Sequence, residues 1–416
     1  MGLNGLIRVP SDKSITHRAI LFGAIASGET VVMNPLLGAD CRSTIDAVRS
    51  LGASVEELDE RLRIKGVASV VPATLDCGNS GTTMRLLSGL VSGYSGEFTL
   101  VGDDSLSKRP MRRITEPLRQ MGADIDGEFA PVRIKGRRLS GIDYTLPVAS
   151  AQVKSAILLA GLRADGTTIV REPMLSRDHT ERMLPLFGGR VEITNEDGVR
   201  TIRLSSSHLD GATVDVPADP SSAAFFWAGA AIVPNSRVTT TDVCLNETRI
   251  GFLRTLERMG ANVEITRLRP LGEETVGDVT VTTSELQGVT LEGEAIPRQI
   301  DELPLFALVA SQASSPSVVK DAGELRVKET DRIKTVASEL AALGVDIRET
   351  EDGFSVFPSR LQAGHVSSHA DHRLSMMLQV AALLIDEPVV IDGIEASEIS
   401  YPHFRDDLQR LGREIE

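Results

Sequence analysis

The chain has 416 residues, of which 41% are apolar and 25% are charged, and its formal net charge is −14. This composition is typical of a folded globular protein, and the length predicts two domains of about 200 residues each. The acidic balance and the 4% aromatic content argue against a general nucleic-acid binder. Any anionic ligand must therefore find a local cluster of cations.

The N-terminal stretch and the cysteines predict a cytoplasmic protein. MGLNGLIRVP has neither the basic nor the apolar region of a signal peptide, and the longest apolar stretch, residues 223–233, is too short to span a bilayer. Cys41, Cys77 and Cys244 form no CxxC pair, and three thiols cannot all be bridged. We therefore expect a reducing compartment and no membrane association.

One short pattern recurs six times: an apolar residue, Gly, a short linker, Val or Ile, and a charge. The copies are LGASVE (51–56), MGADID (121–126), FGGRVE (187–192), MGANVE (259–264), LGVDIR (343–348) and LGREIE (411–416). Their glycines lie 70, 66, 72, 84 and 68 residues apart. An amphipathic helical pattern precedes each copy, so we expect a left-handed Gly at the helix end and a strand from the Val or Ile. The chain therefore reads as six repeats of one unit.

Each repeat also contains a second predicted helix, rich in Ala and nearly free of charge after its first turn. These helices occupy 14–26, 81–93, 150–162, 221–233, 302–313 and 372–384. Because they are apolar on most sides, we expect them to be buried at the centre of each half, with sheets outside. The predicted fold class is therefore α/β, with two domains of three repeats.

The predicted domains are 14–216 and a discontinuous domain made of 1–13 and 217–416. The last repeat stops at residue 416 with no strand after it. We expect the N-terminal strand GLIRVP (5–10) to take that missing place. The chain would then pass between the domains twice, near Lys13 and near residues 216–219.

Polar residues gather in the first turn of each apolar helix. The opening segments are SDKSITHR (11–18), GNSGTTMR (78–85), SAQVK (150–154), ADPSS (218–222), IDE (300–302) and ADHR (370–373). A helix N-terminus attracts anions through its free N–H groups and its dipole. Several such ends meeting in a cleft between the domains would bind a small molecule with two or three negative charges.

Each of these features also has a simpler interpretation. Taken alone, the small polar residues of GNSGTTMR are helix caps, because neither a Walker loop nor a dinucleotide fingerprint is present. His365, His369 and His372 have the spacing of a metal site but lack a supporting fourth ligand, so we predict no metal. Cys77 reads as a core thiol, and the charged stretch RVKETDRI (326–333), taken alone, as the solvated start of a helix.

Taken together, the motifs resemble one enzyme family. SDKSITHR, GNSGTTMR, SLSKRPM (105–111), SAQVKSAILLAG, SRDHTE (176–181), RVKETDRI and DHRLSM (371–376) occur in the order found in 5-enolpyruvylshikimate-3-phosphate synthases, over nearly the whole chain. The resemblance implies an inside-out α/β barrel pair of six repeats. It also implies a transferase of the shikimate pathway, active without cofactor or metal as a monomer, and inhibited by glyphosate.

The resemblance implies two substrates and a role for particular residues. The enolpyruvyl group of phosphoenolpyruvate would pass to the 5-hydroxyl of shikimate 3-phosphate. Asp301 resembles the base on that hydroxyl, and Glu329 resembles the acid and base at the methylene carbon. Lys13 and His372 complete the catalytic set. The residues that the resemblance places on phosphoenolpyruvate are Lys13, Asn79, Gly81, Arg109, Gln152, Arg332 and Arg373.

Shikimate 3-phosphate would contact a second set of residues. That set is Lys13, Ser14, Arg18, Ser150, Ala151, Gln152, Ser176, Asp301 and Lys328. The charged stretch RVKETDRI would then be a catalytic turn, with Lys328, Glu329 and Arg332 each facing a different part of the substrate pair. We expect Glu329 and Arg332, three residues apart, to share one helical face. The chain departs from many members where they carry Lys before an aromatic-Pro pair, because Ile399 and Ser400 stand there.

Two other functions stay open on the sequence. The first is enolpyruvyl transfer to UDP-N-acetylglucosamine, on the same fold and with the same cosubstrate. That family typically uses a Cys or Asp on a mobile loop as proton donor, and none of the three cysteines here is expected in such a loop. The second is a non-catalytic anion-binding protein, which would need neither Asp301 nor Glu329.

Overall fold

The computed structural model describes residues 2–412 and divides them into two compact units. The N-terminal unit comprises Ser11–Val216 with Leu271–Glu273. The C-terminal unit comprises Pro217–Pro270 and the described residues of Met1–Pro10 and Glu274–Glu416. Each unit has an apolar core of its own. Among the described residues, no helix has the length and apolar character that crossing a membrane requires.

The N-terminal unit is built from one repeated arrangement of strands and helices. In the second repeat, β5 (Thr74–Asp76) leads into α3 (Gly81–Ser92), and β6 (Gly96–Val101) returns parallel to β5. Helix α4 (Arg112–Gln120) and the antiparallel pair β7 (Asp124–Asp126) and β8 (Val132–Gly136) follow, giving the sheet order β5-β6-β8-β7. Parallel strands need such a helical crossover, which explains why each repeat alternates strand and helix.

The other two repeats of this unit have the same plan. Their sheets have the orders β15-β2-β4-β3 and β10-β12-β14-β13, and β9 pairs with β11 beside them. The bounds of these strands are β2 Glu29–Met33, β3 Ser54–Leu58, β4 Arg61–Lys65, β9 Leu139–Ser140, β10 Asp143–Thr145, β11 Ala164–Asp165, β12 Thr167–Glu172, β13 Arg190–Glu196, β14 Val199–Ser205 and β15 Thr213–Asp215. The helices are α1 (Lys13–Ile25), α2 (Ala39–Ser50), α5 (Ala151–Gly161) and α6 (His179–Met183).

The C-terminal unit has two four-stranded sheets and one two-stranded sheet within the described residues, with the orders β1-β16-β18-β17, β19-β20-β22-β21 and β23-β24. The strands are β1 Asn4–Ile7, β16 Arg237–Cys244, β17 Asn262–Leu271, β18 Glu274–Thr282, β19 Thr290–Leu291, β20 Ser317–Val319, β21 Ile347–Glu349, β22 Phe354–Val356, β23 His365–Ser367 and β24 Val390–Asp392. The helices are α7 (Pro220–Ile232), α8 (Gly251–Arg258), α9 (Leu303–Ser311), α10 (Arg332–Ala342), α11 (His372–Ala382) and α12 (Phe404–Leu411).

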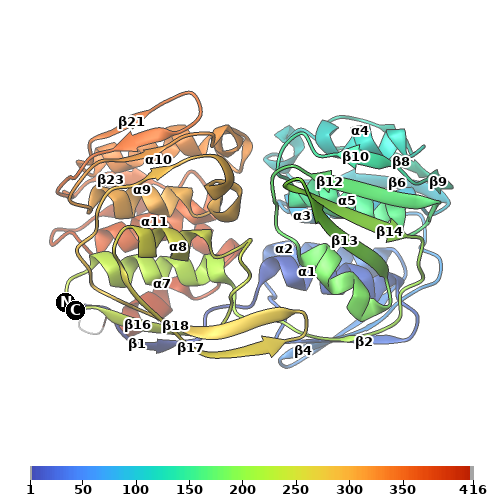
Figure 1. Cartoon of the computed structure of the whole chain (residues 1–416), viewed down its shortest axis with the longest axis horizontal. Coiled ribbons are helices and arrows are strands. Elements are labelled where there is room, and N and C mark those ends of the chain that lie inside the picture. The colour runs from blue at the N-terminus through green and yellow to red at the C-terminus, as the bar shows by residue number, and fades with distance from the viewer. Residues whose placement is uncertain (1, 413–416) are drawn as a thin grey trace. The chain divides into compact units, whose positions relative to one another are not determined.

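The apolar helices lie inside each unit, as the sequence predicts. Every residue of α7 is buried, and α9 is buried throughout as well. Figure 1 shows α7, α9 and α11 stacked within the C-terminal unit, with the strands on its outside. A helix that is apolar on all sides has to be enclosed, so the centre of each unit is a bundle and the sheets cover it. The α/β fold class predicted from the sequence is thus confirmed.

The repeated glycines end helices in most copies. Gly52, Gly122, Gly188, Gly260 and Gly344 all have positive φ, between 79° and 101°. This is the conformation that Gly adopts without the steric penalty of a side chain. The prediction is wrong for the sixth copy, where Gly412 has a φ of −91°. The strand expected after it falls on residues 413–416, which lie outside the described residues.

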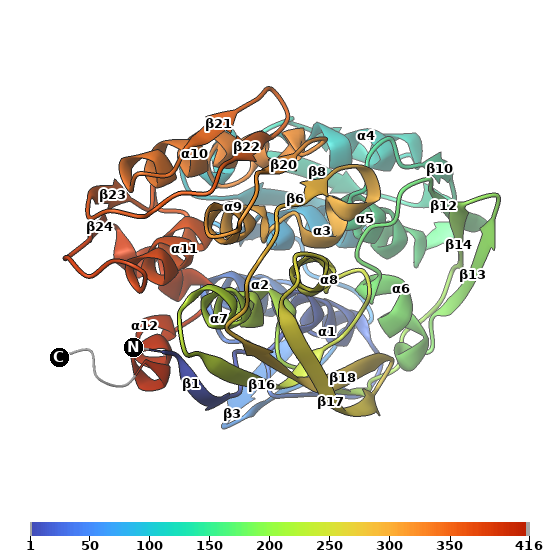
Figure 2. The same ribbon diagram turned by 60° about the vertical axis from the view of Figure 1, so that its left-hand side comes forward.

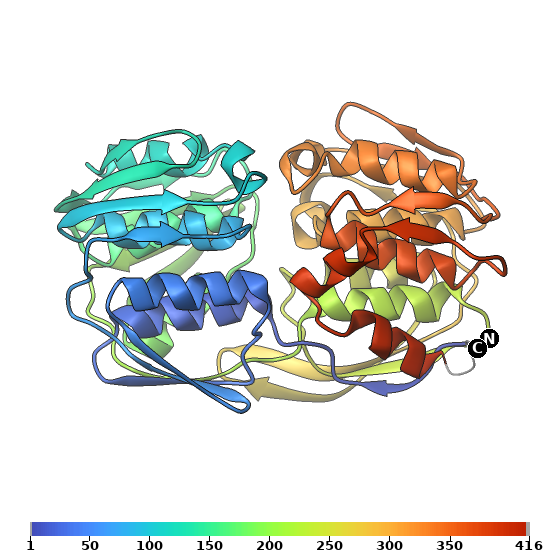
Figure 3. The same ribbon diagram turned by 180° about the vertical axis from the view of Figure 1, so that it is seen from behind.

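The N-terminal strand β1 lies at the edge of the first sheet of the C-terminal unit. Strand β1 pairs in parallel with β16 of the fourth repeat (Figure 2). The end of the sixth repeat, where we predicted its partner, falls on residues 413–416, outside the described residues. Strand β15, which directly precedes the C-terminal unit, pairs in parallel with β2 of the first repeat. Strand β1 thus directly precedes helix α1 of the N-terminal unit but belongs to a sheet of the C-terminal unit. Strand β15 directly precedes helix α7 of the C-terminal unit but belongs to a sheet of the N-terminal unit. In Figure 3 the blue strand β1 lies within the C-terminal unit.

Candidate active site

The first turns of the three buried helices in the N-terminal unit are capped by side chains. Asp12, Ser80 and Ser150 accept hydrogen bonds from backbone N–H groups of α1, α3 and α5. The simpler interpretation of GNSGTTMR is therefore right in part, because Ser80 is a cap. Capping fixes where each helix begins. It thereby fixes the positions of the first helical residues, which are Lys13, Gly81 and Ala151.

Lys13 is held by a carboxylate from the neighbouring helix. Its Nζ lies 2.9 Å from Oδ2 of Asp40, in the first turn of α2, and both side chains are mostly buried. An ammonium flanked by a carboxylate stays charged and keeps a defined position. Ser14 follows it on α1 and is half-buried. Sequence reasoning identified Lys13 but missed Asp40, which lies 27 residues away.

Two arginines surround the start of α3. A Cβ added at Gly81 would lie 3.0 Å from Nη1 of Arg85 and 3.4 Å from Nη1 of Arg109. Arg109 Nη2 donates to Oδ1 of Asn79 at 2.9 Å. Arg85 Nη1 donates to Oε1 of Gln152 at 2.6 Å, which links α3 to α5. The N-terminus of α3 thus brings together four of the predicted phosphoenolpyruvate residues, Asn79, Gly81, Arg109 and Gln152. Two guanidinium groups, those of Arg85 and Arg109, lie beside it.

A second cluster forms where α1, α5 and α6 meet. Arg18 is buried, and it donates through Nε to Thr180 Oγ1 and through Nη2 to Ser155 Oγ, both at 2.7 Å. Ser176 lies in the loop before α6 and donates to Oε1 of Glu172 at 2.5 Å. The predicted shikimate 3-phosphate residues of this unit thus lie at the ends of α1 and α5 and in the loop between β12 and α6.

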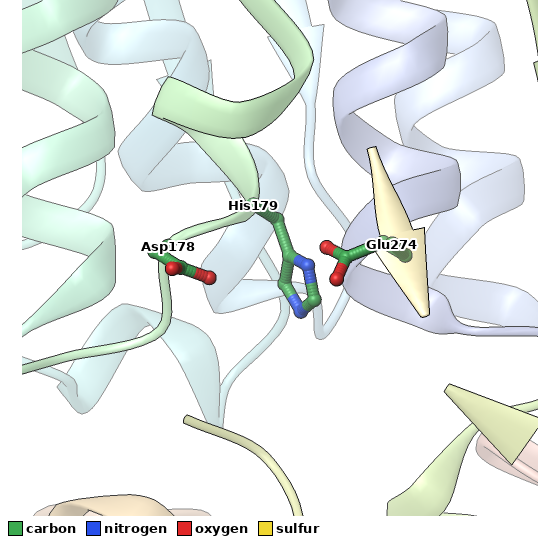
Figure 4. A group of neighbouring side chains, drawn as sticks. All are labelled: Asp178, His179 and Glu274. Carbon is green, nitrogen blue, oxygen red and sulfur yellow. The ribbon is translucent and has the colours of Figure 1, made fainter. Parts of the chain in front are cut away.

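Helix α6 begins with two charged or polar side chains that are buried. Figure 4 shows Asp178 and His179 at this point of the chain. The Asp178 carboxylate pairs with Arg182 at 2.8 Å and with Arg200 at 3.3 Å. These pairs fix the start of α6, and with it the position of Thr180, which holds Arg18.

The charged stretch RVKETDRI does not form a helical turn throughout. Helix α10 begins at Arg332, and Asp331 is its N-cap and accepts from Lys334 N at 3.1 Å. Lys328 and Glu329 precede the cap, so Glu329 and Arg332 do not share a helical face as we expected. Their side chains are nevertheless in direct contact, and the backbone bends at residues 328–330 before the cap.

Arg332 is the centre of the charge cluster in the C-terminal unit. Its side chain is 1% exposed, and Nη2 lies 2.7 Å from Oε2 of Glu329 while Nη1 lies 3.5 Å from Oδ1 of Asp301. Asp371, the N-cap of α11, accepts from Nε at 2.7 Å and from Nη2 at 3.1 Å. One guanidinium thus joins the two predicted acid–base carboxylates and a third, buried one.

The charges of this cluster favour the ionised forms of Arg332 and Asp371. Burial alone lowers the pKa of Arg332, but the charges of Asp371, Glu329 and Asp301 outweigh burial and raise it. Burial alone raises the pKa of Asp371, but Arg332 outweighs burial and holds that pKa below its usual value. Arg332 and Asp371 therefore form a permanently charged buried pair.

The first turn of α11 contributes the remaining predicted residues. His372 and Arg373 are buried there, and Arg373 Nη1 donates to the carbonyl oxygen of Ser221 at 3.2 Å. The other two histidines of the HVSSHADH stretch have separate partners. His365 pairs with Asp392 and His369 with Glu339, each at 2.9 Å.

Cys77 does not have the properties of a nucleophile. The thiol is buried, and burial raises its pKa to about 12, with Asp76 adding to the effect. A catalytic cysteine needs a lowered pKa and access to its substrate. The interpretation of Cys77 as a core thiol agrees with this environment.

The comparison with known proteins identifies the family. The sequence model of EPSP synthase (3-phosphoshikimate 1-carboxyvinyltransferase) matches residues 1–408. The chain belongs to the EPSP synthase family. It is 49% identical to the 3-phosphoshikimate 1-carboxyvinyltransferase of Bacillus velezensis, over 99% of this chain and 98% of that protein. It is 50% identical to the one of Geobacillus kaustophilus, over 98% of both chains.

Solved structures of the family have the same fold. EPSP synthase from Acinetobacter baumannii superposes with a TM-score of 0.85 at 42% identity, covering 99% of this chain and 96% of that one. The enolpyruvyl transferase NikO from Streptomyces tendae is similar in fold alone, with a TM-score of 0.79 at 18% identity, covering 99% of this chain and 95% of that one.

Residues that support the predicted site were missed by the motif comparison. Asp40 holds Lys13, Arg85 holds Gln152, Glu172 holds Ser176, and Asp371 holds Arg332. Each lies 4 to 67 residues from its partner along the chain. In the sequence, two of them stand out only because they lie at the start of a buried helix: Arg85 in GNSGTTMR and Asp371 in ADHR. Nothing in the sequence pairs any of these four with its partner.

Proposed function

We propose that this chain is a 3-phosphoshikimate 1-carboxyvinyltransferase, which transfers the enolpyruvyl group of phosphoenolpyruvate to the 5-hydroxyl of shikimate 3-phosphate and releases phosphate. The observation that carries the proposal is the family match over residues 1–408, together with relatives of that name at 49 to 50% identity over at least 98% of the chain. The cluster of Asp301, Glu329 and Arg332 supports it, because the reaction needs two carboxylates beside cations.

The reaction has two steps, an addition and an elimination, and each step requires two proton transfers. The 5-hydroxyl oxygen bonds to carbon 2 of phosphoenolpyruvate while its proton passes to Asp301, and carbon 3 takes a proton from Glu329. In the resulting tetrahedral adduct, carbon 3 returns a proton to Glu329 and the bond between carbon 2 and the phosphate oxygen breaks. Phosphate leaves with that bonding pair and takes up the proton that Asp301 holds, which returns both carboxylates to their starting states. No phosphoryl group is transferred. Both carboxylates therefore act as acid and as base in turn.

Phosphoenolpyruvate carries a carboxylate and a phosphate, so its site needs several cations. We assign Lys13, Arg109, Arg332 and Arg373 to these anions, because guanidinium groups bind carboxylate and phosphate with two parallel hydrogen bonds. In the structure Arg332 already binds carboxylates of the protein itself. The incoming anion would compete with Glu329 for Arg332. Asn79, Gly81 and Gln152 line the same subsite, and His372 lies next to Arg373 in the chain.

Shikimate 3-phosphate takes the second subsite. Arg18 would pair with its carboxylate, while Ser150 and Ser176 would bind its 3-phosphate with the N-terminus of α5, at Ala151 and Gln152. The remaining assigned contacts are Lys13, Ser14, Asp301 and Lys328. These residues come from both units, and we propose that both units contribute to substrate binding. The cytoplasmic location, the monomeric state and catalysis without cofactor or metal stay predictions.

One experiment tests the proposal against its rivals. The protein is mixed with phosphoenolpyruvate and either shikimate 3-phosphate or UDP-N-acetylglucosamine, in the presence of a metal chelator, and phosphate release is followed. We expect release with shikimate 3-phosphate alone. Release with the sugar nucleotide alone would replace the proposed function by the rival transfer. Tight binding of both anions without phosphate release would favour the non-catalytic protein.

A further inference from the structure

Lys154 is a buried charge in an otherwise apolar part of α5. It lies four residues after the cap Ser150, and the residues from Ala156 to Leu162 are all apolar or Gly. Its Nζ donates to Oε2 of Glu172 at 2.9 Å and to Oε1 of Glu181 at 2.8 Å, and none of the three side chains is exposed. A buried ammonium between two buried carboxylates is a poor source of stability, because the desolvation of three charges offsets their attraction.

The two carboxylates connect Lys154 to the shikimate 3-phosphate residues. Glu172 ends β12, and its Oε1 accepts from both the hydroxyl and the backbone N–H of Ser176. Glu181 lies in α6 next to Thr180, which binds Arg18. One ammonium thus joins the helix that begins after Ser150 to the loop that carries Ser176.

The number of charges in this cluster makes the orientation of Glu172 depend on Lys154. Lys154 supplies one positive charge for two carboxylates, and Arg200 Nη2 lies 3.8 Å from Oε1 of Glu181 as a second cation. Glu172 is tied to Lys154 and Ser176, so its orientation depends on the ammonium. If Lys154 were neutral, Glu172 would be a buried carboxylate without its cation and would move or take up a proton. Either change alters the acceptor that orients the Ser176 hydroxyl.

We infer that Lys154 is a positioning residue of the shikimate 3-phosphate subsite, which acts through Glu172 on Ser176. The inference rests on the proposed function, which places Ser176 on the substrate. Lys154 itself, being fully buried, touches no substrate. Its loss should therefore weaken shikimate 3-phosphate binding and leave phosphoenolpyruvate binding and the chemical step almost unchanged.

The first test compares Lys154→Met with the wild type and with Lys320→Met. Lys320 pairs with Glu292 on the surface and serves as the matched control. In Lys154→Met we expect the Kd of shikimate 3-phosphate, measured by calorimetry, and its KM to rise about tenfold, with the KM of phosphoenolpyruvate and kcat within about twofold. Lys320→Met should behave as the wild type. A lowered Tm with both Michaelis constants unchanged would show a purely structural role and overturn the inference.

A double-mutant cycle tests the route through Ser176. If Lys154 acts through this hydroxyl, Lys154→Met should have a much smaller effect on the Kd of shikimate 3-phosphate in a Ser176→Ala background. Additive effects would exclude that route. Should Lys154→Met fail to fold, the charge-balanced variant Lys154→Met/Glu172→Gln removes the pair without leaving a lone charge. Wild-type affinity in that folded variant would equally overturn the inference.

The wild-type assay distinguishes a failure of the role of Lys154 from a failure of the proposed function. If the wild type turns over shikimate 3-phosphate and only the variants behave unlike our expectation, the role of Lys154 is wrong and the proposed function stands. If the wild type does not turn over shikimate 3-phosphate, the proposed function fails, and the role of Lys154 fails with it.

Discussion

Arg332 and Glu329 form a direct ion pair, with 2.7 Å between Nη2 and Oε2, although the helix begins only at Arg332. Asp301 contacts the same guanidinium, at 3.5 Å. The two proposed acid–base groups are therefore coupled through one cation before any substrate binds. In the proposed mechanism, a phosphoenolpyruvate anion bound to Arg332 would weaken this coupling, and Glu329 would exchange its proton with carbon 3.

Glu329→Gln should abolish most of the turnover. The amide keeps the shape of the side chain and its hydrogen bond to Arg332 but cannot exchange the proton, so we expect kcat to fall about 100-fold or more. The dissociation constants of both substrates should change little. Steady-state kinetics with calorimetric titration of each ligand measures both quantities. Near-normal turnover would mean that Glu329 is not the acid and base at carbon 3.

Arg332→Ala should affect both binding and folding. Phosphoenolpyruvate should bind far more weakly, and the free energy of unfolding should fall by about 3 kcal/mol, because Asp371 loses the partner of its buried charge. Denaturant unfolding and calorimetry separate the two effects.

Arg332→Lys is the matched control for this change. It keeps the charge but loses the two parallel hydrogen bonds to Asp371, so its stability should lie between wild type and Arg332→Ala. Shikimate 3-phosphate should bind all three proteins alike. An unchanged affinity for phosphoenolpyruvate in Arg332→Ala would remove Arg332 from that subsite.

Gly81→Ala should discriminate between phosphoenolpyruvate and glyphosate, the longer competitive inhibitor that the family resemblance implies. The new methyl group would lie 3.0 Å from Arg85 Nη1, which must shift by a few tenths of an ångström, and 3.4 Å from Arg109 Nη1, which is an ordinary contact. The methyl group itself would take up space in the proposed subsite. A longer ligand should lose more contact than the natural substrate. We expect the inhibition constant of glyphosate to rise more than the KM of phosphoenolpyruvate. An equal rise in both would place Gly81 elsewhere.

The stability of the protein should depend on His17 in acid. His17 Nδ1 is 2.7 Å from Thr44 Oγ1, and burial lowers the pKa of His17 from 6.5 to about 3, against the opposing charge of Asp40. Between these two values the unfolded chain binds a proton that the folded chain excludes. The contribution of neutral His17 is therefore complete above pH 6.5 and is lost as the pH falls towards 3, by about 1.4 kcal/mol per pH unit.

His17→Asn isolates this contribution. The amide can replace the contact to Thr44 but does not titrate, so the difference in unfolding free energy between wild type and variant should change with pH below 6.5 and be constant above it. Chemical denaturation at a series of pH values measures this difference. A difference that is independent of pH would show that His17 is not buried in its neutral form.

The repeats and the buried helices follow from the sequence alone. Helix periodicity and a Gly at each helix end are local properties, so the chain displays them wherever it folds. That is why the α/β class could be predicted, and why five of the six glycines that we predicted to be left-handed have this conformation. The sixth failed because Gly412 has a φ of −91°, which any residue can adopt.

The motifs also led to the residues of the proposed site, one at a time. Resemblance to the family selected Lys13, Arg109, Asp301, Glu329 and Arg332 without any knowledge of their contacts. The residues that hold these side chains in place could not be predicted, because a partner such as Asp371 comes next to Arg332 only when the chain folds. The expected helical face shared by Glu329 and Arg332 was wrong for a similar reason, since the Asp331 cap sets where α10 begins.

Tertiary structure alone decided which strands pair and which charges meet. The pairing of strand β1 with β16 depends on which open edge the folded unit presents. The Lys154–Glu172–Glu181 cluster likewise joins α5, β12 and α6. Sequence fixes what each segment can form by itself, whereas contacts between distant segments depend on burial and on the loss of water around paired charges, which exist only in the folded chain.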